Sequence, residues 1–214
     1  MAINHHLSDK ILMAHAAGNL PEAFALVAAS HLSFCDDCRA RLGAFEAIGG
    51  AMLDRCEGAA LAADSLEATL ARIDAGPTTR IRPQPRPRGA LPAPLADYVG
   101  GDLASVRWRP IGMGVRQAVI CSGDGASARL LHIASGRAVP DHGHRGLEMT
   151  LVLQGAFRDE TARFGPGDIE IADASTEHTP VAEPGADCIC LAATDAPLRF
   201  NAFLPRIAQS FLRI

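Results

Sequence analysis

Three residues of types that bind metals lie close together near the start of the chain. His31, Cys35 and Cys38 occur in the spacing H-x3-C-x2-C. If a helix carries His31, Cys35 follows one turn later on the same face, and Cys38 comes after a short turn. Structural zinc prefers imidazole nitrogen and thiolate sulfur, in tetrahedral groups of four. The spacing therefore predicts most of a zinc site, with the alternative that these are buried residues of ordinary helices.

The fourth ligand must come from another part of the chain. His5 and His6 precede the first predicted helix, in a segment that is able to reach the site. His15 lies inside that helix, and Cys56 lies far along a later one. We predict His6 as the fourth ligand, with His5 as the alternative. A site of two histidines and two cysteines leaves no position for a substrate, so the predicted zinc is structural.

Residues 1–75 show the apolar periodicity of helices and predict four of them. The predicted helices start near Ser8, Pro21, Asp37 and Asp64. Phe24, Val27 and His31 share one face of the second helix, and Asp64 with Glu67 predicts a capping box for the fourth. Apolar residues expected along one side of the third helix are Leu42, Phe45, Ile48 and Met52. Those expected to face inward in the fourth are Leu66, Leu70 and Ile73.

The charge of this helical region argues against nucleic-acid binding. Residues 1–75 hold five basic and ten acidic side chains, a net charge of −5. Proteins that hold DNA place lysine and arginine on its phosphates, so an acidic surface repels DNA and attracts a basic protein surface. The H-x3-C-x2-C motif, with His6 upstream in a small acidic helical region, resembles the zinc-binding anti-sigma factor family. The resemblance implies an ECF-type sigma factor as the partner, without direct contact to nucleic acid or a membrane.

The second half of the chain has the pattern of strands. Short apolar runs at 116–122, 128–134, 148–155, 168–174 and 187–194 are separated by Gly, Pro and Asp. His142 and His144 lie two residues apart, so on a strand they point to the same side, and Glu148 follows after a turn. Across roughly residues 100–195 the sequence resembles the two cupin motifs. This resemblance implies a metal held by His142, His144, Glu148 and His178. The alternative is a cupin barrel that has lost its metal.

A linker separates the two halves. Residues 76–94 contain six prolines, four arginines and no acidic residue, which predicts an extended, semi-rigid segment. We predict two domains: an N-terminal all-α four-helix zinc domain (1–75) and a C-terminal all-β cupin of jelly-roll type (95–195). Residues 196–214 form a C-terminal segment with a short helix beginning at Pro205. Imidazole and carboxylate suit several divalent metals in the cupin, and zinc is the favoured one.

The composition predicts a cytoplasmic globular protein. The chain is 48% hydrophobic and 21% charged, with no apolar run long enough to span a membrane and no signal-peptide pattern at its start. Six cysteines are few for a chain of this length, and two of them lie in a metal motif, which indicates a reducing compartment. Cys188 and Cys190 form a C-x-C pair on the last long strand. We interpret them as small apolar barrel residues, with an oxidisable pair near the cupin metal as the alternative.

The combination of a zinc anti-sigma region with a cupin resembles the ChrR-type group of anti-sigma factors. That resemblance implies a protein that is not an enzyme and that holds back a sigma factor until a response to singlet oxygen is needed. It also implies that the cupin half is required for the response to the signal. The alternative is a metal-dependent cupin enzyme, a dioxygenase or an isomerase, with a regulatory zinc domain. Co-purification with a sigma factor separates the two hypotheses.

Overall fold

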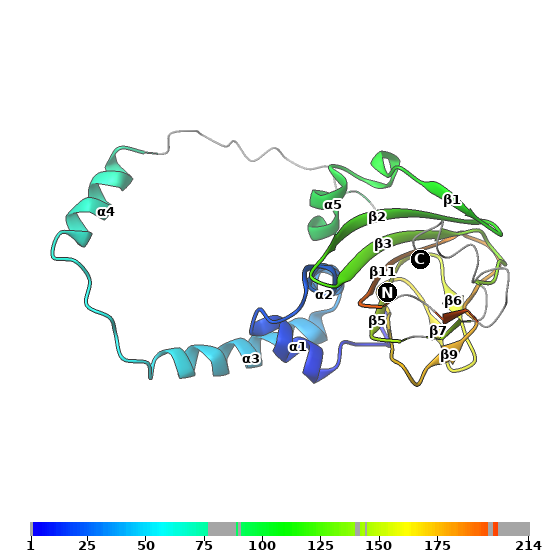
Figure 1. Ribbon diagram of the computed structural model, residues 1–214, viewed down its shortest axis with the longest axis horizontal. Coiled ribbons are helices and arrows are strands. Elements are labelled where there is room, and N and C mark those ends of the chain that lie inside the picture. Colours follow the sequence, from blue (N-terminus) through cyan, green and yellow to red (C-terminus); the bar gives the residue numbers. More distant parts are fainter. Residues whose placement is uncertain are drawn as a thin grey trace.

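In the part of the chain that the structure describes, the fold is an antiparallel β-barrel with four α-helices packed at one side and a fifth set apart from it (Figure 1). The computed structural model describes residues 2–76, 89, 91–139, 142–143, 145–196 and 199–200. The fold class predicted from the sequence is confirmed: helices come first, and an antiparallel sheet follows. The helices are α1 (Asp9–Ala16), α2 (Glu22–Leu32), α3 (Asp36–Leu53), α4 (Ser65–Asp74) and α5 (Ala93–Val99).

A six-stranded sheet forms the main wall of the barrel. Its order is β1-β2-β3-β11-β5-β8, and neighbouring strands run antiparallel. These strands are β1 (Arg109–Gly112), β2 (Val115–Gly123), β3 (Ala126–Ile133), β11 (Cys188–Thr194), β5 (Glu148–Gln154) and β8 (Ile169–Ala172). Two three-stranded sheets complete the barrel. They contain β10 (Val181–Ala182), β6 (Phe157–Arg158) and β7 (Arg163–Phe164), and β12 (Arg199–Phe200), β4 (His142–Gly143) and β9 (Glu177–His178).

Alternation along the strands gives the large sheet two buried faces. On β11, Ile189 and Leu191 belong to the cluster that packs against α2, whereas Cys188 and Cys190 face the barrel interior. Such a sheet needs apolar side chains at both odd and even positions, because successive residues point to opposite faces. This explains the nearly continuous apolar run of β11, of which the first four residues are all buried.

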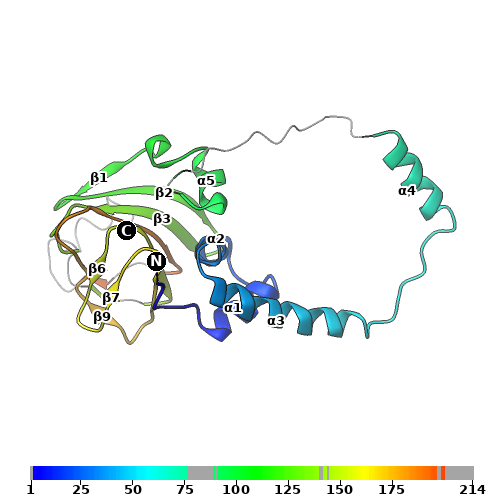
Figure 2. The ribbon, with the colours of Figure 1, turned by 180° about the vertical axis from the view of Figure 1, so that it is seen from behind.

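Helix α2 is the element that joins the helical region to the barrel. Eight of its eleven residues are buried, Phe24 and Val27 among them, and they share one apolar cluster with the sheet residues Leu130, Met149 and Leu191. The figures show α2 end-on against the sheet, beside α5 (Figure 2). Helix α5 was not predicted: it begins inside the segment interpreted as linker, and it packs on α2 and β2.

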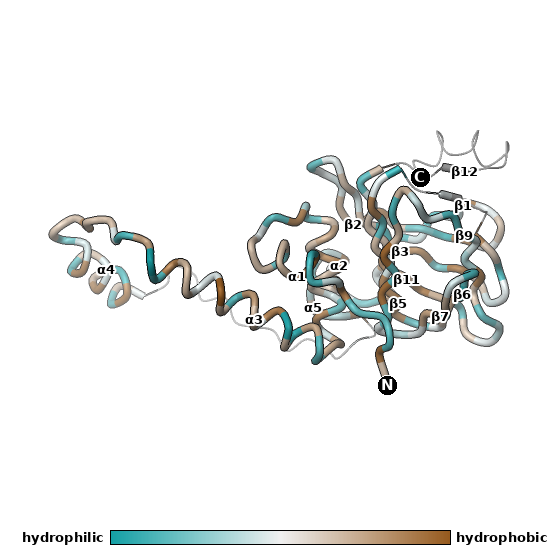
Figure 3. The backbone as a smooth tube through the Cα atoms, turned by 90° about the horizontal axis from the view of Figure 1, so that it is seen from below, coloured by the Kyte–Doolittle hydropathy of each residue, from teal (hydrophilic) through white to brown (hydrophobic). Residues whose placement is uncertain are grey.

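Helix α4 corrects one prediction. Leu66, Leu70 and Ile73 were expected to face inward, but they are 66%, 50% and 67% exposed. Asp64 lies at the N-cap without a side-chain cap bond, so the predicted capping box does not form. In the described chain α4 lies apart from the barrel, and residues 54–64 separate it from the end of the projecting α3 (Figures 1 and 3). The predicted helix from Pro205 lies outside the described residues.

Candidate metal centres

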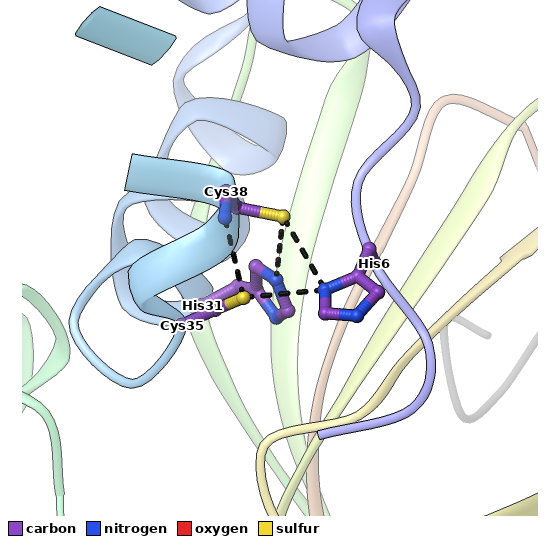
Figure 4. A group of neighbouring side chains, drawn as sticks. All are labelled: His6, His31, Cys35 and Cys38. Atoms are coloured by element: carbon purple, nitrogen blue, oxygen red, sulfur yellow. Dashed lines mark hydrogen bonds between the residues drawn. The ribbon is translucent and has the colours of Figure 1, made fainter. Parts of the chain in front are cut away.

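Four side chains predicted as zinc ligands meet in one place. One ligand atom from each of His6, His31, Cys35 and Cys38 lies within 4.8 Å of the others. The His6 Nδ1 atom is 3.2 Å from the Cys35 sulfur, and the His31 Nε2 atom is 3.3 Å from the Cys38 sulfur (Figure 4). Three of the four residues are buried and His6 is half-buried. The donor set, two imidazoles and two thiols, matches that of closed structural zinc sites.

Three short segments position these ligands. His31 lies in the last turn of α2, and its carbonyl oxygen accepts a hydrogen bond from the backbone N–H of Cys35. Cys35 is the N-cap of α3, where its sulfur accepts from the backbone N–H of Cys38 at 3.4 Å. The sequence puts Cys38 in the first turn of that helix, where the helix dipole favours a thiolate. His6 comes from the extended arm that precedes α1.

The electrostatics of this site fit a bound cation. Burial lowers the pKa of His31 to about 4, so its imidazole is neutral and has a lone pair for a metal. Burial, and after it the neighbouring Cys35, raise the pKa of the Cys38 thiol to about 11. The buried Cys38 thiol therefore stays protonated unless a positive charge lies beside it. A divalent cation supplies that charge and displaces the protons.

His5, the alternative fourth ligand, and Cys56 both lie outside the cluster. The His5 ring faces the barrel, with its centroid 4.4 Å from that of Phe164 and its Nδ1 3.6 Å from the Asp168 carboxylate. Cys56 is exposed beyond the end of α3, where its thiol donates to the Met52 carbonyl oxygen. Of the two histidines that the sequence left open, His5 and His6, the structure places His6 in the cluster.

A second group of ligand-type side chains lies inside the barrel. The His178 Nδ1 atom is 2.9 Å from a Glu170 oxygen and 3.4 Å from an Asp159 oxygen. All three side chains are at most 8% exposed. Burial lowers the pKa of His178, but the hydrogen bond and charge of Glu170 outweigh it, and the net pKa is raised. Burial, followed by the charge of Glu170, raises the pKa of Glu148 to about 7.

The predicted cupin ligands are placed only in part. The backbone of His142 pairs directly with that of His178 across β4 and β9, and Glu148 begins β5. The side chain of His142 and the whole of His144 lie outside what the structure describes. Glu148 and Glu170 line a cavity of about 60 Å³, and Cys190 lines it too. The Cys188 and Cys190 sulfurs are 3.5 Å apart and buried.

Two residues of this group, Asp159 and Glu170, were not predicted from the sequence. A signal for Glu170 was present, because it interrupts the apolar run of β8 between two isoleucines, and a buried carboxylate needs a partner. Asp159 precedes a turn in which its Oδ1 accepts from the backbone of Thr161 and Ala162. Burial raises the pKa of the Asp159 carboxyl, but these hydrogen bonds outweigh it and hold the pKa well below its usual range. Turn aspartates are common, so the sequence alone gave no reason to single this one out.

Comparisons with known proteins agree with this architecture. Residues 97–197 match the family model of the ChrR cupin-like domain. The chain is 62% identical over all 214 residues, and over the full length of the relative, to the anti-sigma-E factor ChrR of Cereibacter sphaeroides. Its structure superimposes on a crystal structure of Rhodobacter sphaeroides SigE in complex with the anti-sigma ChrR, at a TM-score of 0.81 and 60% identity. That match covers 91% of this chain and 100% of the other.

A more distant match is an RmlC-like cupin protein from Ralstonia eutropha, with a TM-score of 0.42 and 24% identity over 48% of this chain and 71% of the other. None of the helices in the described residues is both long and apolar enough to cross a membrane. The curated relative is a regulatory protein rather than an enzyme. Identity that extends over the whole length, through helices, motif and barrel alike, places the chain in the ChrR family of anti-sigma factors.

Proposed function

We propose that this protein binds and inhibits an ECF-type sigma factor. The observation that carries the proposal is the full-length match to the anti-sigma-E factor ChrR. A second match is to a ChrR chain that was crystallised in complex with SigE. We further propose that the sigma factor is released in the response to singlet oxygen, that the barrel is required for this release, and that the protein acts in the cytoplasm.

The outer helices provide a surface that suits such a partner. Exposed apolar side chains occur on α3 and on α4, two helices separated by residues 54–64, and as a set we call them the outer apolar face: Ile48, Met52, Leu53, Leu66, Leu70 and Ile73. An isolated ten-residue helix is marginal in water, so α4 needs a partner to stabilise it. Each of these side chains contributes about 1.5–3 kcal/mol when it is fully buried. The acidic charge of residues 1–75 favours a basic partner surface.

Two metals belong to the proposal. A structural Zn²⁺ is held by His6, His31, Cys35 and Cys38, and it fixes the start of α3 against the end of α2. A second divalent metal, with zinc favoured, is held in the barrel by His142, His144, Glu148 and His178. The hydrogen bond from the His178 Nδ1 atom to Glu170 supports this second site, because a carboxylate in that position orients the imidazole of a metal ligand.

The test is binding and transcription with purified SigE of Rhodobacter sphaeroides. The triple variant Leu66→Ser/Leu70→Ser/Ile73→Ser should bind SigE at least about 100-fold more weakly, since two lost anchors of 1.4 kcal/mol or more each account for that factor. The control is Met113→Ser, which removes an equally exposed apolar side chain from the β1–β2 turn. Full inhibition of SigE-dependent transcription by the triple variant would contradict the outer apolar face as the binding surface. No binding of SigE by the unmodified chain would contradict the function itself.

A further inference from the structure

One tight turn of the barrel contacts His31 and the arm that carries His6. The turn runs from Gly165 to Asp168, between β7 and β8. Gly167 has φ +90°, a conformation that favours glycine. Its N–H donates to the Val152 carbonyl oxygen at 2.8 Å, and the Val152 N–H donates to the Asp168 carbonyl oxygen at 3.0 Å. These two bonds attach the turn to β5, so the position of the turn is set by the barrel.

The turn orients His31 through a backbone carbonyl. The His31 Nδ1 atom is 2.9 Å from the Gly167 oxygen, and the two residues are 136 positions apart in the chain. A carbonyl oxygen only accepts, so Nδ1 carries the hydrogen and Nε2 carries the lone pair that faces the Cys38 sulfur. His31 is fully buried, so these protein groups, and not bulk water, satisfy its two ring nitrogens.

The same turn fixes the arm that carries His6. The Asp168 carboxylate is buried, and its Oδ1 accepts from the backbone N–H of Asn4 at 2.7 Å and of His5 at 3.0 Å. Its Oδ2 accepts from the Gly165 N–H at 2.8 Å. The Ile169 N–H donates to the His5 carbonyl oxygen, so the arm is held immediately before His6. A Cβ atom at residue 167 would lie 2.9 Å from the Ile3 side chain, which shows how closely the arm approaches the turn.

We propose that the Gly167–Asp168 turn of the barrel is the outer support of the N-terminal zinc site and sets its metal affinity. The turn holds the His31 ring and the arm immediately before His6, whereas the start of α3 carries both cysteines. Hydrogen-bond partners of metal ligands orient them, and loss of such a partner typically weakens binding about 10- to 100-fold. Asp168 is therefore a positioning residue for a metal that it does not contact. This inference rests on the zinc site of the proposed function.

The discriminating variant is Asp168→Asn in the full-length chain. Both carboxylate oxygens accept from backbone N–H groups, so an amide in their place must turn its NH₂ group toward an N–H donor. Asp173→Asn is the matched control, because Asp173 makes the same kind of turn contacts with Ser175 at an exposed position. A second variant, Asn4→Pro, removes one of the N–H donors from the arm and leaves the barrel sequence unchanged, with Ala2→Pro as its control.

Co²⁺ is the probe, because cobalt bound to cysteine gives a thiolate charge-transfer absorption. We expect both Asp168→Asn and Asn4→Pro to bind Co²⁺ at the thiolate site about 10- to 100-fold more weakly, with a changed ligand-field spectrum at saturation. Competition with Zn²⁺ should rank the variants in the same order of metal affinity. The affinity of both control variants should stay within about twofold of that of the unmodified chain. Unchanged affinity and spectrum in folded Asn4→Pro and Asp168→Asn would overturn the proposal.

Cys35→Ser separates this inference from the one on which it rests. If Cys35→Ser removes the thiolate absorption while the turn variants bind normally, the support role fails and the zinc site stands. If Cys35→Ser leaves the absorption unchanged, the metal is bound elsewhere and both proposals fall. If the absorption is lost in Cys35→Ser and weakened in the turn variants, both are supported.

Discussion

Replacement of Phe24 by Ala tests whether the helical region and the barrel unfold as one unit. Phe24 is 2% exposed on α2, in the apolar cluster that continues into the sheet. Removal of a buried phenylalanine side chain costs about 3–5 kcal/mol, because apolar contacts are lost and a cavity remains. For a chain of this size, with a urea dependence of about 2–3 kcal/mol/M, the unfolding midpoint should fall by about 1–2 M.

The single tryptophan of the chain makes the assay specific. Trp108 lies beside the barrel, with its ring 5.5 Å from that of His132 on β3, so its fluorescence reports on unfolding of the barrel. If the two parts share a core, the Phe24→Ala change shifts the Trp108 transition. Leu70→Ala is the matched control on α4, where the side chain is half exposed, and it should leave the transition within about 0.3 M. A Trp108 transition that is the same in Phe24→Ala as in the unmodified chain would refute the shared core.

Three further outcomes follow from the two metal centres. Cys38→Ser should abolish zinc binding at the N-terminal site and inhibition of the sigma factor with it, because structural zinc contributes on the order of 10 kcal/mol to such small sites; elemental analysis and a transcription assay measure both. Residues 1–75 with zinc should suffice to inhibit, since they carry the ligands and the outer apolar face; unimpaired transcription in the presence of the folded fragment would contradict this. Ala at His142, His144, Glu148 or His178 should remove the barrel metal and blunt the response of a sigma-dependent reporter to singlet oxygen while sigma binding persists. Variants that respond like the unmodified chain would exclude a sensing role for that metal.

Local signals were sufficient to predict most of the elements. Ser8 accepts from the Ile11 N–H, as a cap should, and the five apolar runs became β2, β3, β5, β8 and β11. The apolar face of α2 was recognised from its period, although the sequence did not show that it covers a sheet. The spacing of apolar residues identifies which face of a helix is buried, but it does not identify the surface that covers this face. The same limit explains α4, whose apolar face is exposed in the chain alone.

Contacts between distant residues were beyond prediction from one sequence. The spacing indicated His31, Cys35 and Cys38 as ligands, because these three residues lie within eight positions of the sequence. His6 could be proposed only by elimination, and Asp168 not at all, since it is 163 and 164 positions from the backbone groups that it holds. Glu170 was overlooked for a related reason: its partner His178 lies across the barrel interior on another strand.

The placement of Asp168 and Glu170 bears on how a signal in the barrel can reach the outer helices. They are two residues apart, one holding the arm before His6 and the other bonded to His178. The Gly167 carbonyl oxygen is bonded to His31, which lies beside the two cysteines at the start of α3. Helix α3 carries part of the outer apolar face. A signal shifts a bound–released equilibrium only when it changes the free energies of the two states unequally. A barrel that supports the zinc ligands in one state and not in the other meets that condition, whereas a barrel tethered only by a linker does not.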